Sequence, residues 1–255
     1  MSRPASDSTQ RFSNRVASYV AGRPHYPAAV VTHLQTVGAL RAGGVVADIG
    51  VGTGLSAEPF LKAGHRVIGV EPNAPMRAAG AEMLAPFPLY EARDGTAEAT
   101  GLATASIDLV IAGQAFHWFD ATKFRDEALR ILQPGGWAAL IWNDRDRDAT
   151  PFLASYEALL VEYGNDYLHI SHAHESGAIA TFFGGRIPPA ERIEHSRRLD
   201  WPTMAAMAGS ASYLPAPGQP RHDAFVAALR ALFDREAVAG TIEMRYRCRI
   251  HAAPL

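Results

Sequence analysis

A short apolar segment that ends in three closely spaced glycines constrains this chain more than any other feature. Residues 45–49 (Val-Val-Ala-Asp-Ile) have the length and composition of a buried strand, and Gly50, Gly52 and Gly54 follow them directly. The next segment, residues 56–63, has the pattern of a helix. Glycines between a strand and a helix let the backbone approach a ligand that side chains would exclude. The sequence therefore predicts a ligand-binding turn at the carboxyl end of a strand.

Strand-like and helix-like segments alternate along the first part of the chain. The predicted strands are residues 45–49, 66–71, 88–92, 107–112 and 137–142, and the predicted helices are residues 28–34, 56–63, 74–84 and 120–132. Strands that alternate with helices form a mostly parallel α/β sheet with helices on both faces. The ligand crevice of such a sheet lies at the carboxyl ends of its strands.

The second part of the chain lacks this regular alternation of strands and helices. It predicts helices at residues 151–163 and 222–237 and strands at residues 193–199 and 241–250, with irregular segments between them. We found no repeat and no flexible linker, so we expect one domain over residues 1–255. Residues 45–142 are its predicted cofactor-binding core. The predicted lid and acceptor-pocket segments are residues 1–27, 151–190 and 200–220.

The glycine spacing separates two classes of ligand. In the dinucleotide fingerprint, the position five residues after the first glycine is small, whereas this chain has Leu55 there and Gly54 one place too early. This spacing disfavours an NAD-dependent oxidoreductase. Glu71 ends the second predicted strand, 17 residues after Gly54. A carboxylate there can accept hydrogen bonds from ribose hydroxyls in either class, so it does not discriminate between them.

The pattern Asp48-x-Gly50-x-Gly52-Thr53-Gly54 resembles motif I of the class I S-adenosylmethionine-dependent methyltransferases. The resemblance implies a Rossmann-like, doubly wound and mostly parallel sheet of seven strands, with the last strand antiparallel and a helical or loop lid. It also implies that the glycine loop surrounds the methionine and ribose parts of S-adenosylmethionine, and that S-adenosylhomocysteine is the product.

Further segments extend the resemblance. Residues 19–27, 115–119 and 210–213 look like the type 11 methyltransferases grouped with trans-aconitate methyltransferase. Many members have Asp where this chain has Thr96, so Thr96 or the backbone of Ala97 is expected to meet adenine. The cofactor-binding residues that the resemblance implies are Tyr19, Arg23, Asp48, Gly50, Gly52, Thr53, Gly54, Glu71, Pro72, Thr96, Ala97, Gly113 and Gln114. Arg23 would pair with the cofactor carboxylate.

His117 is the candidate catalytic residue. It follows the fourth predicted strand, where a histidine can accept a proton from an acceptor hydroxyl or orient that hydroxyl. Packing in the crevice wall is the alternative role for this side chain. The candidate acceptor-pocket residues are Phe116, Trp118, Asn143, His172 and Tyr213.

Two charged or histidine-rich segments have simpler explanations. His169, His172, His174 and Glu175 form a metal-like cluster, but a sulfonium methyl donor is already activated and needs no metal. We therefore predict no metal, and place these side chains nearer to the acceptor pocket. The run Asp-Arg-Asp-Arg-Asp at residues 144–148 alternates in sign, which predicts mutual neutralisation on an exposed loop. The alternative is that Asn143 or Asp144 faces the acceptor.

Composition limits the choice of partner. The chain has 24 Lys and Arg residues against 26 Asp and Glu residues, so no basic excess favours nucleic acid. One cysteine allows no internal disulfide, and no apolar run has the length of a membrane span. We expect a cytoplasmic enzyme of undetermined oligomeric state that methylates a small molecule on a hydroxyl or carboxylate oxygen. The alternatives are an NAD-dependent oxidoreductase and a non-catalytic cofactor-binding protein.

Overall fold

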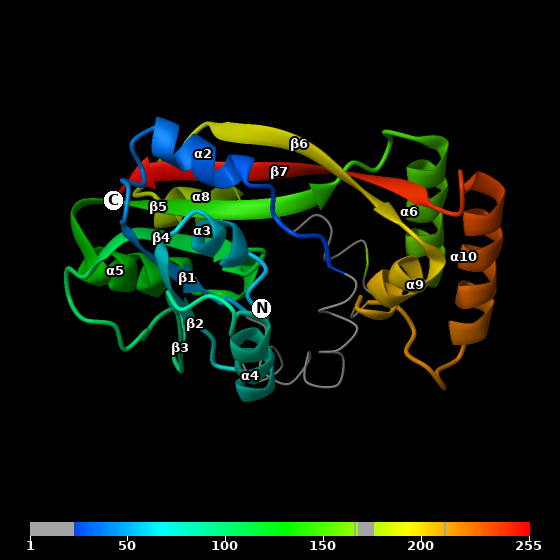
Figure 1. The fold of residues 1–255 in the computed structure, drawn as a ribbon, viewed down its shortest axis with the longest axis horizontal. Coiled ribbons are helices and arrows are strands. Elements are labelled where there is room, and N and C mark those ends of the chain that lie inside the picture. Colours follow the sequence, from blue (N-terminus) through cyan, green and yellow to red (C-terminus); the bar gives the residue numbers. More distant parts are fainter. Residues whose placement is uncertain (1–22, 166, 168–175, 212) are drawn as a thin grey trace.

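A seven-stranded sheet forms the centre of the molecule (Figure 1). The computed structural model describes residues 23–165, 167, 176–211 and 213–255. The strands are β1 (Val45–Ile49), β2 (Arg66–Val70), β3 (Tyr90–Arg93), β4 (Ile107–Gly113), β5 (Leu132–Arg145), β6 (Ala190–Leu199) and β7 (Ile242–Pro254), in the order β3-β2-β1-β4-β5-β7-β6. β7 runs antiparallel to both of its neighbours, and the remaining strands share one direction. This topology confirms the predicted Rossmann-like fold.

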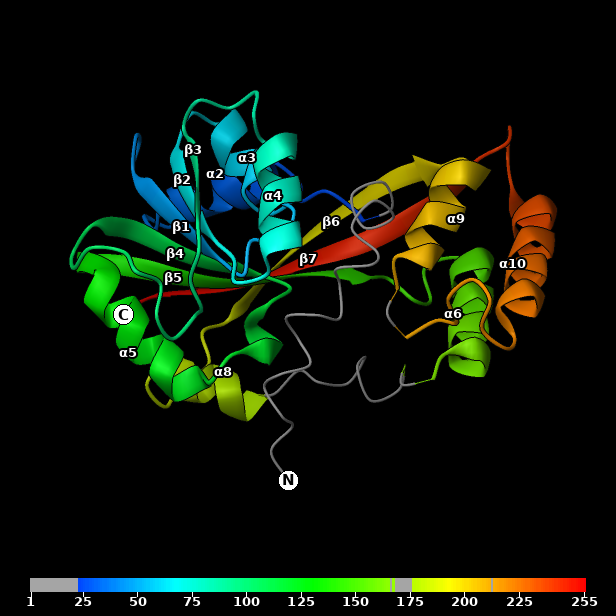
Figure 2. The same cartoon turned by 90° about the horizontal axis from the view of Figure 1, so that it is seen from below.

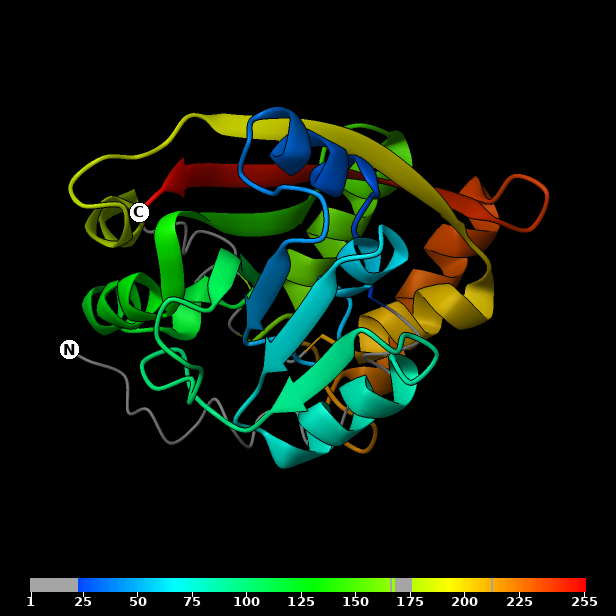
Figure 3. The same ribbon diagram turned by 60° about the vertical axis from the view of Figure 1, so that its left-hand side comes forward.

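Helices cover both faces of the sheet. On one face, α2 (Ala29–Thr36), α3 (Glu58–Lys62) and the turn that follows α4 (Ala74–Met83) contribute buried side chains to one hydrophobic cluster. On the other face, α5 (Ala121–Ile131) and α8 (Ser176–Phe182) contribute to a second cluster. Because consecutive residues of a buried strand point to opposite faces, β1 supplies Val46 to the first cluster and Ala47 to the second. Figure 3 shows the twist of this layered arrangement.

Local capping signals set the helix starts around the sheet. The side chain of Asn73 accepts a hydrogen bond from the backbone N–H of Met76 and begins α4. Asp120, predicted as an N-cap from the sequence, accepts from the N–H groups of Thr122 and Lys123 and begins α5. These caps fix where the chain leaves the carboxyl ends of β2 and β4.

A second group of helices packs at the far end of the long strands. β5, β6 and β7 are longer than the parallel strands β1 to β3, and α6 (Pro151–Tyr163), α9 (Trp201–Gly209) and α10 (His222–Glu236) lie against their extensions (Figure 2). These helices share a third hydrophobic cluster with residues of β6 and β7, including Leu199 and Met244. We call this unit, α6, α9 and α10, the helical module.

The structure differs from the sequence expectations in two helices. α8 and α9 were not predicted as helices. α8 lies within residues 151–190, which were expected to form a lid, yet it packs on α5 and buries Phe182 in the sheet cluster. That part of the segment belongs to the core because its aromatic side chains stack there, with Phe182 and Phe124 rings 4.7 Å apart. Among the described helices, none is both long and apolar enough to cross a membrane.

Candidate cofactor and acceptor site

The glycine turn after β1 has no room for larger side chains. Gly50 and Gly54 both have positive φ angles, of 69° and 92°. A Cβ atom on Gly50 would lie 2.7 Å from the Cβ of Ala115, and one on Gly54 would lie 2.5 Å from Leu84. The loop therefore packs closely against the segments after β4 and α4.

Glu71 ties this loop to the end of β2. One carboxylate oxygen accepts from the N–H of Gly52 at 2.9 Å, and the other accepts from the N–H of Asn73 at 2.9 Å. Burial raises the pKa of Glu71, although both backbone hydrogen bonds and the charge of Arg77 act in the opposite direction. The predicted ribose-binding carboxylate is thus held rigidly beside the glycine loop.

Asp48 lies beneath the loop and is completely buried. The hydroxyl of Ser56 donates to its Oδ2 at 2.6 Å, whereas Oδ1 has no hydrogen-bond partner within the described part of the chain. Burial raises the pKa of Asp48 to about 7; the hydrogen bond from Ser56 opposes this shift and the charge of Glu71 adds to it. The buried hydroxyl of Thr53 also has no partner among the described residues. Unsatisfied buried polar atoms at a glycine loop are what a ligand with its own polar groups would complete.

The carboxyl end of β4 forms the wall that faces the glycine loop. Gln114 adopts a positive φ angle of 56°, which is uncommon for a residue with a side chain and is found at functional sites. Its N–H donates to Ile141 and its side-chain amide donates to the carbonyl oxygen of Asn143. These bonds join the exits of β4 and β5, so the backbone strain at Gln114 is compensated by two neighbouring contacts.

Two cavities meet at this wall. The smaller, of about 70 Å³, lies over the glycine loop, and the larger, of about 480 Å³, extends towards the helical module. Both are lined by Arg23, Pro24, Gln114 and Asn143. The smaller cavity is also lined by Tyr26, Gly50, Val51, Gly52, Thr53, Leu55, Ser56 and Gly113. Predicted cofactor residues from three separate segments therefore surround the smaller cavity.

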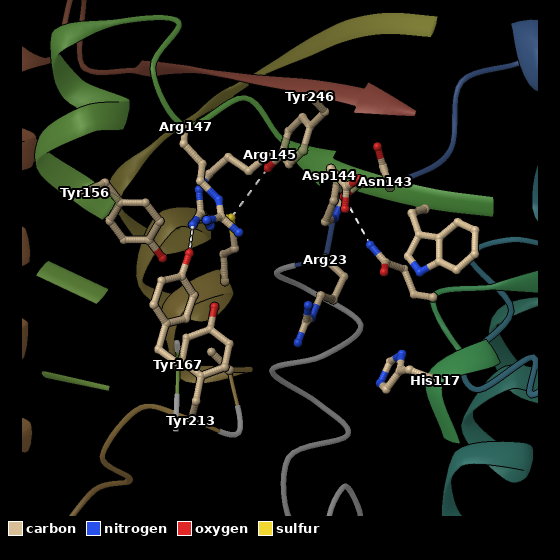
Figure 4. A pocket seen from close by; sticks show the side chains of 15 residues that line it. Arg23, His117, Asn143, Asp144, Arg145, Arg147, Tyr156, Tyr167, Tyr213 and Tyr246 are labelled. Carbon is tan, nitrogen blue, oxygen red and sulfur yellow. Dashed lines mark hydrogen bonds between the residues drawn. The ribbon is translucent and has the colours of Figure 1, made fainter. Parts of the chain in front are cut away.

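The larger cavity contains only part of the predicted acceptor pocket (Figure 4). His117, Asn143 and Tyr213 line it. Phe116 does not, because its ring is buried in the core among Phe124, Phe182 and Trp142. This finding corrects the sequence expectation for Phe116.

Trp118 also lies outside the cavity lining and is exposed at the surface, with its ring 4.9 Å from that of His117. Both residues belong to the short helix η1 (Phe116–Trp118), and of the two His117 is the one that lines the cavity, so the pocket role of Trp118 stays a prediction. Tyr19 and His172 lie outside the described residues.

The adenine end of the predicted cofactor site lies apart from both cavities. Pro72 and Thr96 are exposed, and Ala97 is buried in the sheet cluster. Thr96 forms an isolated bridge with Ala99 beyond the end of β3. The structure thus places these residues at the carboxyl ends of neighbouring strands, and their contact with adenine stays a prediction.

Sequence reasoning missed the charged end of the larger cavity. Arg145 pairs with Glu157 at 2.7 Å, and Arg147 pairs with the same carboxylate at 3.3 Å. Asp144 and Asp146 pair with Arg249 and Arg247 of β7. The ion pairs of this run therefore lead to other elements, and the predicted mutual neutralisation on an exposed loop is wrong. The pairing of β5 with β7 brings Asp144 and Asp146 to their partners, and the packing of α6 brings Glu157 to the two arginines; the local sequence contains neither piece of information.

Asn143 is fixed from two sides. The side-chain oxygen of Asn143 lies 2.7 Å from Nε2 of His195 on β6, and its amide donates to the carbonyl oxygen of His25. Burial lowers the pKa of His195, which favours the neutral imidazole with Nε2 as the donor in this contact. The wall between the two cavities is therefore rigid at Asn143.

No group of three or more potential metal ligands occurs within the described ranges. The cluster of His169, His172, His174 and Glu175 lies outside these ranges. The predicted absence of a metal stays a prediction.

Comparison with known proteins gives the family. Residues 47–140 match the family model described as a methyltransferase domain. Residues 47–140 are therefore a methyltransferase domain. The match includes the glycine loop and Glu71 and ends within β5.

Individual relatives agree with this assignment. A methyltransferase of Mycobacterium bovis, itself uncharacterised, is 36% identical over 140 residues, which are 55% of this chain and 55% of that protein. The chain thus matches about half the length of the curated relatives. A solved structure from Anaeromyxobacter dehalogenans, assigned as a type II methyltransferase, is 26% identical with a TM-score of 0.67 and covers 91% of this chain and 97% of that one.

A more distant methyltransferase shares the fold alone. The geranyl diphosphate C-methyltransferase of Streptomyces coelicolor, solved with Mg²⁺, geranyl diphosphate and S-adenosylhomocysteine, is 14% identical with a TM-score of 0.52. The match covers 99% of this chain and 98% of that one. An NAD-dependent oxidoreductase is not favoured by these comparisons or by Leu55, which lines the smaller cavity.

Proposed function

We propose that this methyltransferase transfers the methyl group of S-adenosylmethionine to a hydroxyl or carboxylate oxygen of a small molecule. The observation that carries the proposal is the wall that the two cavities share. Because Arg23, Gln114 and Asn143 line both, a donor over the glycine loop and an acceptor in the larger cavity would meet at that wall. A cavity of about 480 Å³ has the size of a small-molecule site.

The residues around the smaller cavity fit the cofactor. Arg23 would hold the cofactor carboxylate, and the backbone of Gly52 and Thr53 would lie against the methionine part. Glu71 is not among the described lining residues, but it accepts from the N–H of Gly52 in that lining and would hold the ribose hydroxyls beside the cavity. When bound, S-adenosylmethionine supplies a methyl group already activated by a positive sulfur atom. The hydroxyl of Thr53, which lines the smaller cavity and has no partner among the described residues, would hydrogen-bond to such a ligand or its waters, whereas Asp48 is buried beneath the loop and lines neither cavity.

The protein groups would act mainly by positioning. The acceptor oxygen forms a bond to the methyl carbon while the carbon–sulfur bond breaks and its electron pair stays on sulfur. For a hydroxyl acceptor, His117 would take the proton, since it lines the larger cavity near the shared wall. A carboxylate acceptor is already ionised and needs no base.

Methyl transfer can be tested directly. Incubation with S-adenosylmethionine labelled in its methyl group and a panel of small hydroxy and carboxylic acids should move the label to at least one acceptor. For a hydroxyl acceptor, His117→Ala should lower kcat by about 10²-fold, the usual contribution of a positioned base, with little change in cofactor affinity. His33→Ala is the control, because His33 lies on α2 and lines neither of these cavities.

Two outcomes would count against the account. Cofactor binding without label transfer to any acceptor would favour a non-catalytic binding protein. Full activity of His117→Ala on a hydroxyl acceptor would reduce His117 to a packing residue.

A further inference from the structure

We propose that the end of the larger cavity nearest the helical module binds an acidic group of the acceptor, a carboxylate or a phosphate, as an anchor separate from the oxygen that is methylated. The inference rests on the proposed function, because it takes the shared wall as the place of transfer. It concerns Arg145, Arg147 and the tyrosines around them, which line the larger cavity and not the smaller one.

The lining of the larger cavity has an excess of positive charge. Arg23, Arg145 and Arg147 line the larger cavity, and Asp144 is the acidic residue among its described lining residues. Asp144 is engaged by Arg249, which is not part of the lining. Arg145 and Arg147 share the single carboxylate of Glu157. Two guanidinium groups on one carboxylate leave a positive charge that an anion can neutralise.

Among the described residues, the hydrogen bonds between Arg145, Glu157 and Tyr167 leave one donor of Arg145 unsatisfied. The hydroxyl of Tyr167 donates to both oxygens of Glu157 at 2.6 Å, so this carboxylate already has several donors. Arg145 donates to Glu157 and Tyr167 through Nη2, whereas its buried Nε has no partner within the described part of the chain. A purely structural tie between β5 and α6 would not require an unsatisfied buried donor on a charged group.

Aromatic rings hold both guanidinium groups in place. The guanidinium of Arg145 lies over the ring of Tyr156, 4.8 Å from its centroid, and that of Arg147 lies over Tyr167 at 5.9 Å. Figure 4 shows this group of arginines and tyrosines at one end of the cavity, with Arg23 and His117 towards the other. Planar guanidinium groups held on aromatic rings suit bidentate recognition of carboxylate or phosphate.

The two arginines lie at a distance from the wall that the two cavities share. Asn143 lies in the shared wall and Arg145 is two residues further along β5, so they share a face of the strand and lie roughly 7 Å apart along it. An anion held at Arg145 and Arg147 is therefore displaced from the place of methyl transfer. The acceptor that fits is a small molecule with an acidic group at one end and a nucleophilic oxygen at the other.

Calorimetric titration with benzoate, phenyl phosphate and the neutral benzamide, each in the presence of S-adenosylhomocysteine, tests the assignment. Both anions should bind the wild-type protein at least ten-fold more tightly than benzamide. Arg147→Ala should weaken the anions at least ten-fold, which corresponds to about 1.4 kcal/mol. Arg147→Lys should restore part of the loss, and the tighter of the two anions identifies the acidic group as carboxylate or phosphate.

Two control variants locate the effect. Arg130→Ala removes an arginine of nearly equal side-chain exposure, 39% against 38% for Arg147, which also pairs with a glutamate but lies on α5 away from the cavity. His117→Ala alters the opposite end of the cavity. Each should change anion affinity by less than about two-fold, an effect well below the loss of a charged contact.

The assignment is overturned if benzamide binds as tightly as the anions, or if neither anion binds at millimolar concentration. It is also overturned if Arg147→Ala leaves anion affinity unchanged or if His117→Ala weakens the anions as much. Titration of S-adenosylhomocysteine alone separates the two proposals. If it binds while the anions fail these criteria, only the anchor is wrong; if it does not bind, the proposed function fails as well.

Discussion

Asp48 is the residue whose ionisation should most affect the pH dependence of stability. Its pKa is about 7 in the folded protein, against 3.8 for an ordinary aspartate, because the side chain is completely buried. Between these values the folded protein binds the proton more tightly than the unfolded chain does. The free energy of unfolding therefore falls as pH rises from about 4 to about 7, by up to ~4 kcal/mol from this group.

Asp48→Asn should remove this component. The variant keeps the shape of the protonated side chain, so its stability relative to the wild type should increase from pH 5 to about pH 7 and level off above that. Urea unfolding at several pH values measures the difference. Asp94→Asn is the control, since Asp94 is exposed. A difference between Asp48→Asn and the wild type that does not vary with pH would show that Asp48 does not titrate in this range.

At the scale of elements, the turn between β1 and α3 should tolerate no side chain at Gly54. Gly54→Ala would place a methyl group 2.5 Å from Leu84 and force a positive φ angle on alanine. Gly64→Ala carries the same conformational penalty, but nothing lies within 4 Å of its Cβ. Overpacking costs typically ~1–3 kcal/mol, so Gly54→Ala should be less stable than Gly64→Ala by about that amount. Equal unfolding free energies for the two variants would contradict the packing described for the loop.

The elements around the glycine turn were predictable because their signals are local. The strand at residues 45–49 has the predicted bounds, and α6 begins and ends where the sequence places it. α9 was missed although Asp200 caps its start, with its side chain accepting from Thr203. Apolar residues occur on all sides of this helix, so its sequence lacks the period of an amphipathic helix.

The candidate site also has one part that local sequence predicts and another part that it does not. The glycine loop and Glu71 could be found because a motif within one strand–turn–helix unit specifies them. The charged end of the larger cavity could not be found, since Arg145 on β5 meets Glu157 on α6 and Tyr246 on β7 only through tertiary packing. Phe116 was assigned to the pocket from its place in the chain, whereas its ring packs in the core against Phe124, Phe182 and Trp142.

At the scale of the whole molecule, the sheet face covered by α2 and α3 has one hydrophobic cluster, and the helical module has another. Phe233→Ala removes a buried ring that packs against Trp201 within the module, and should lower stability by ~3–5 kcal/mol. Phe60→Ala removes a buried ring of α3, in the cluster that also contains Val51 of the glycine loop, at a similar expected cost.

The two variants should differ in where they act. Phe233→Ala should accelerate hydrogen exchange mainly in α6, α9 and α10 and change S-adenosylhomocysteine affinity by less than about two-fold. Phe60→Ala should accelerate exchange around β1 and α3 and weaken that affinity more. Identical exchange patterns for the two variants would mean that the molecule has one cooperative core.

The central claim is that the glycine loop and Glu71 form an S-adenosylmethionine site, and binding of S-adenosylhomocysteine tests it most directly. Calorimetric titration should show binding of S-adenosylhomocysteine and none of NADH. Glu71→Ala should weaken S-adenosylhomocysteine at least about ten-fold, because two hydrogen bonds to a charged group are lost; Asp94→Ala, nearby and exposed, should not. Binding of NADH without S-adenosylhomocysteine, or unchanged affinity in Glu71→Ala, would contradict the account.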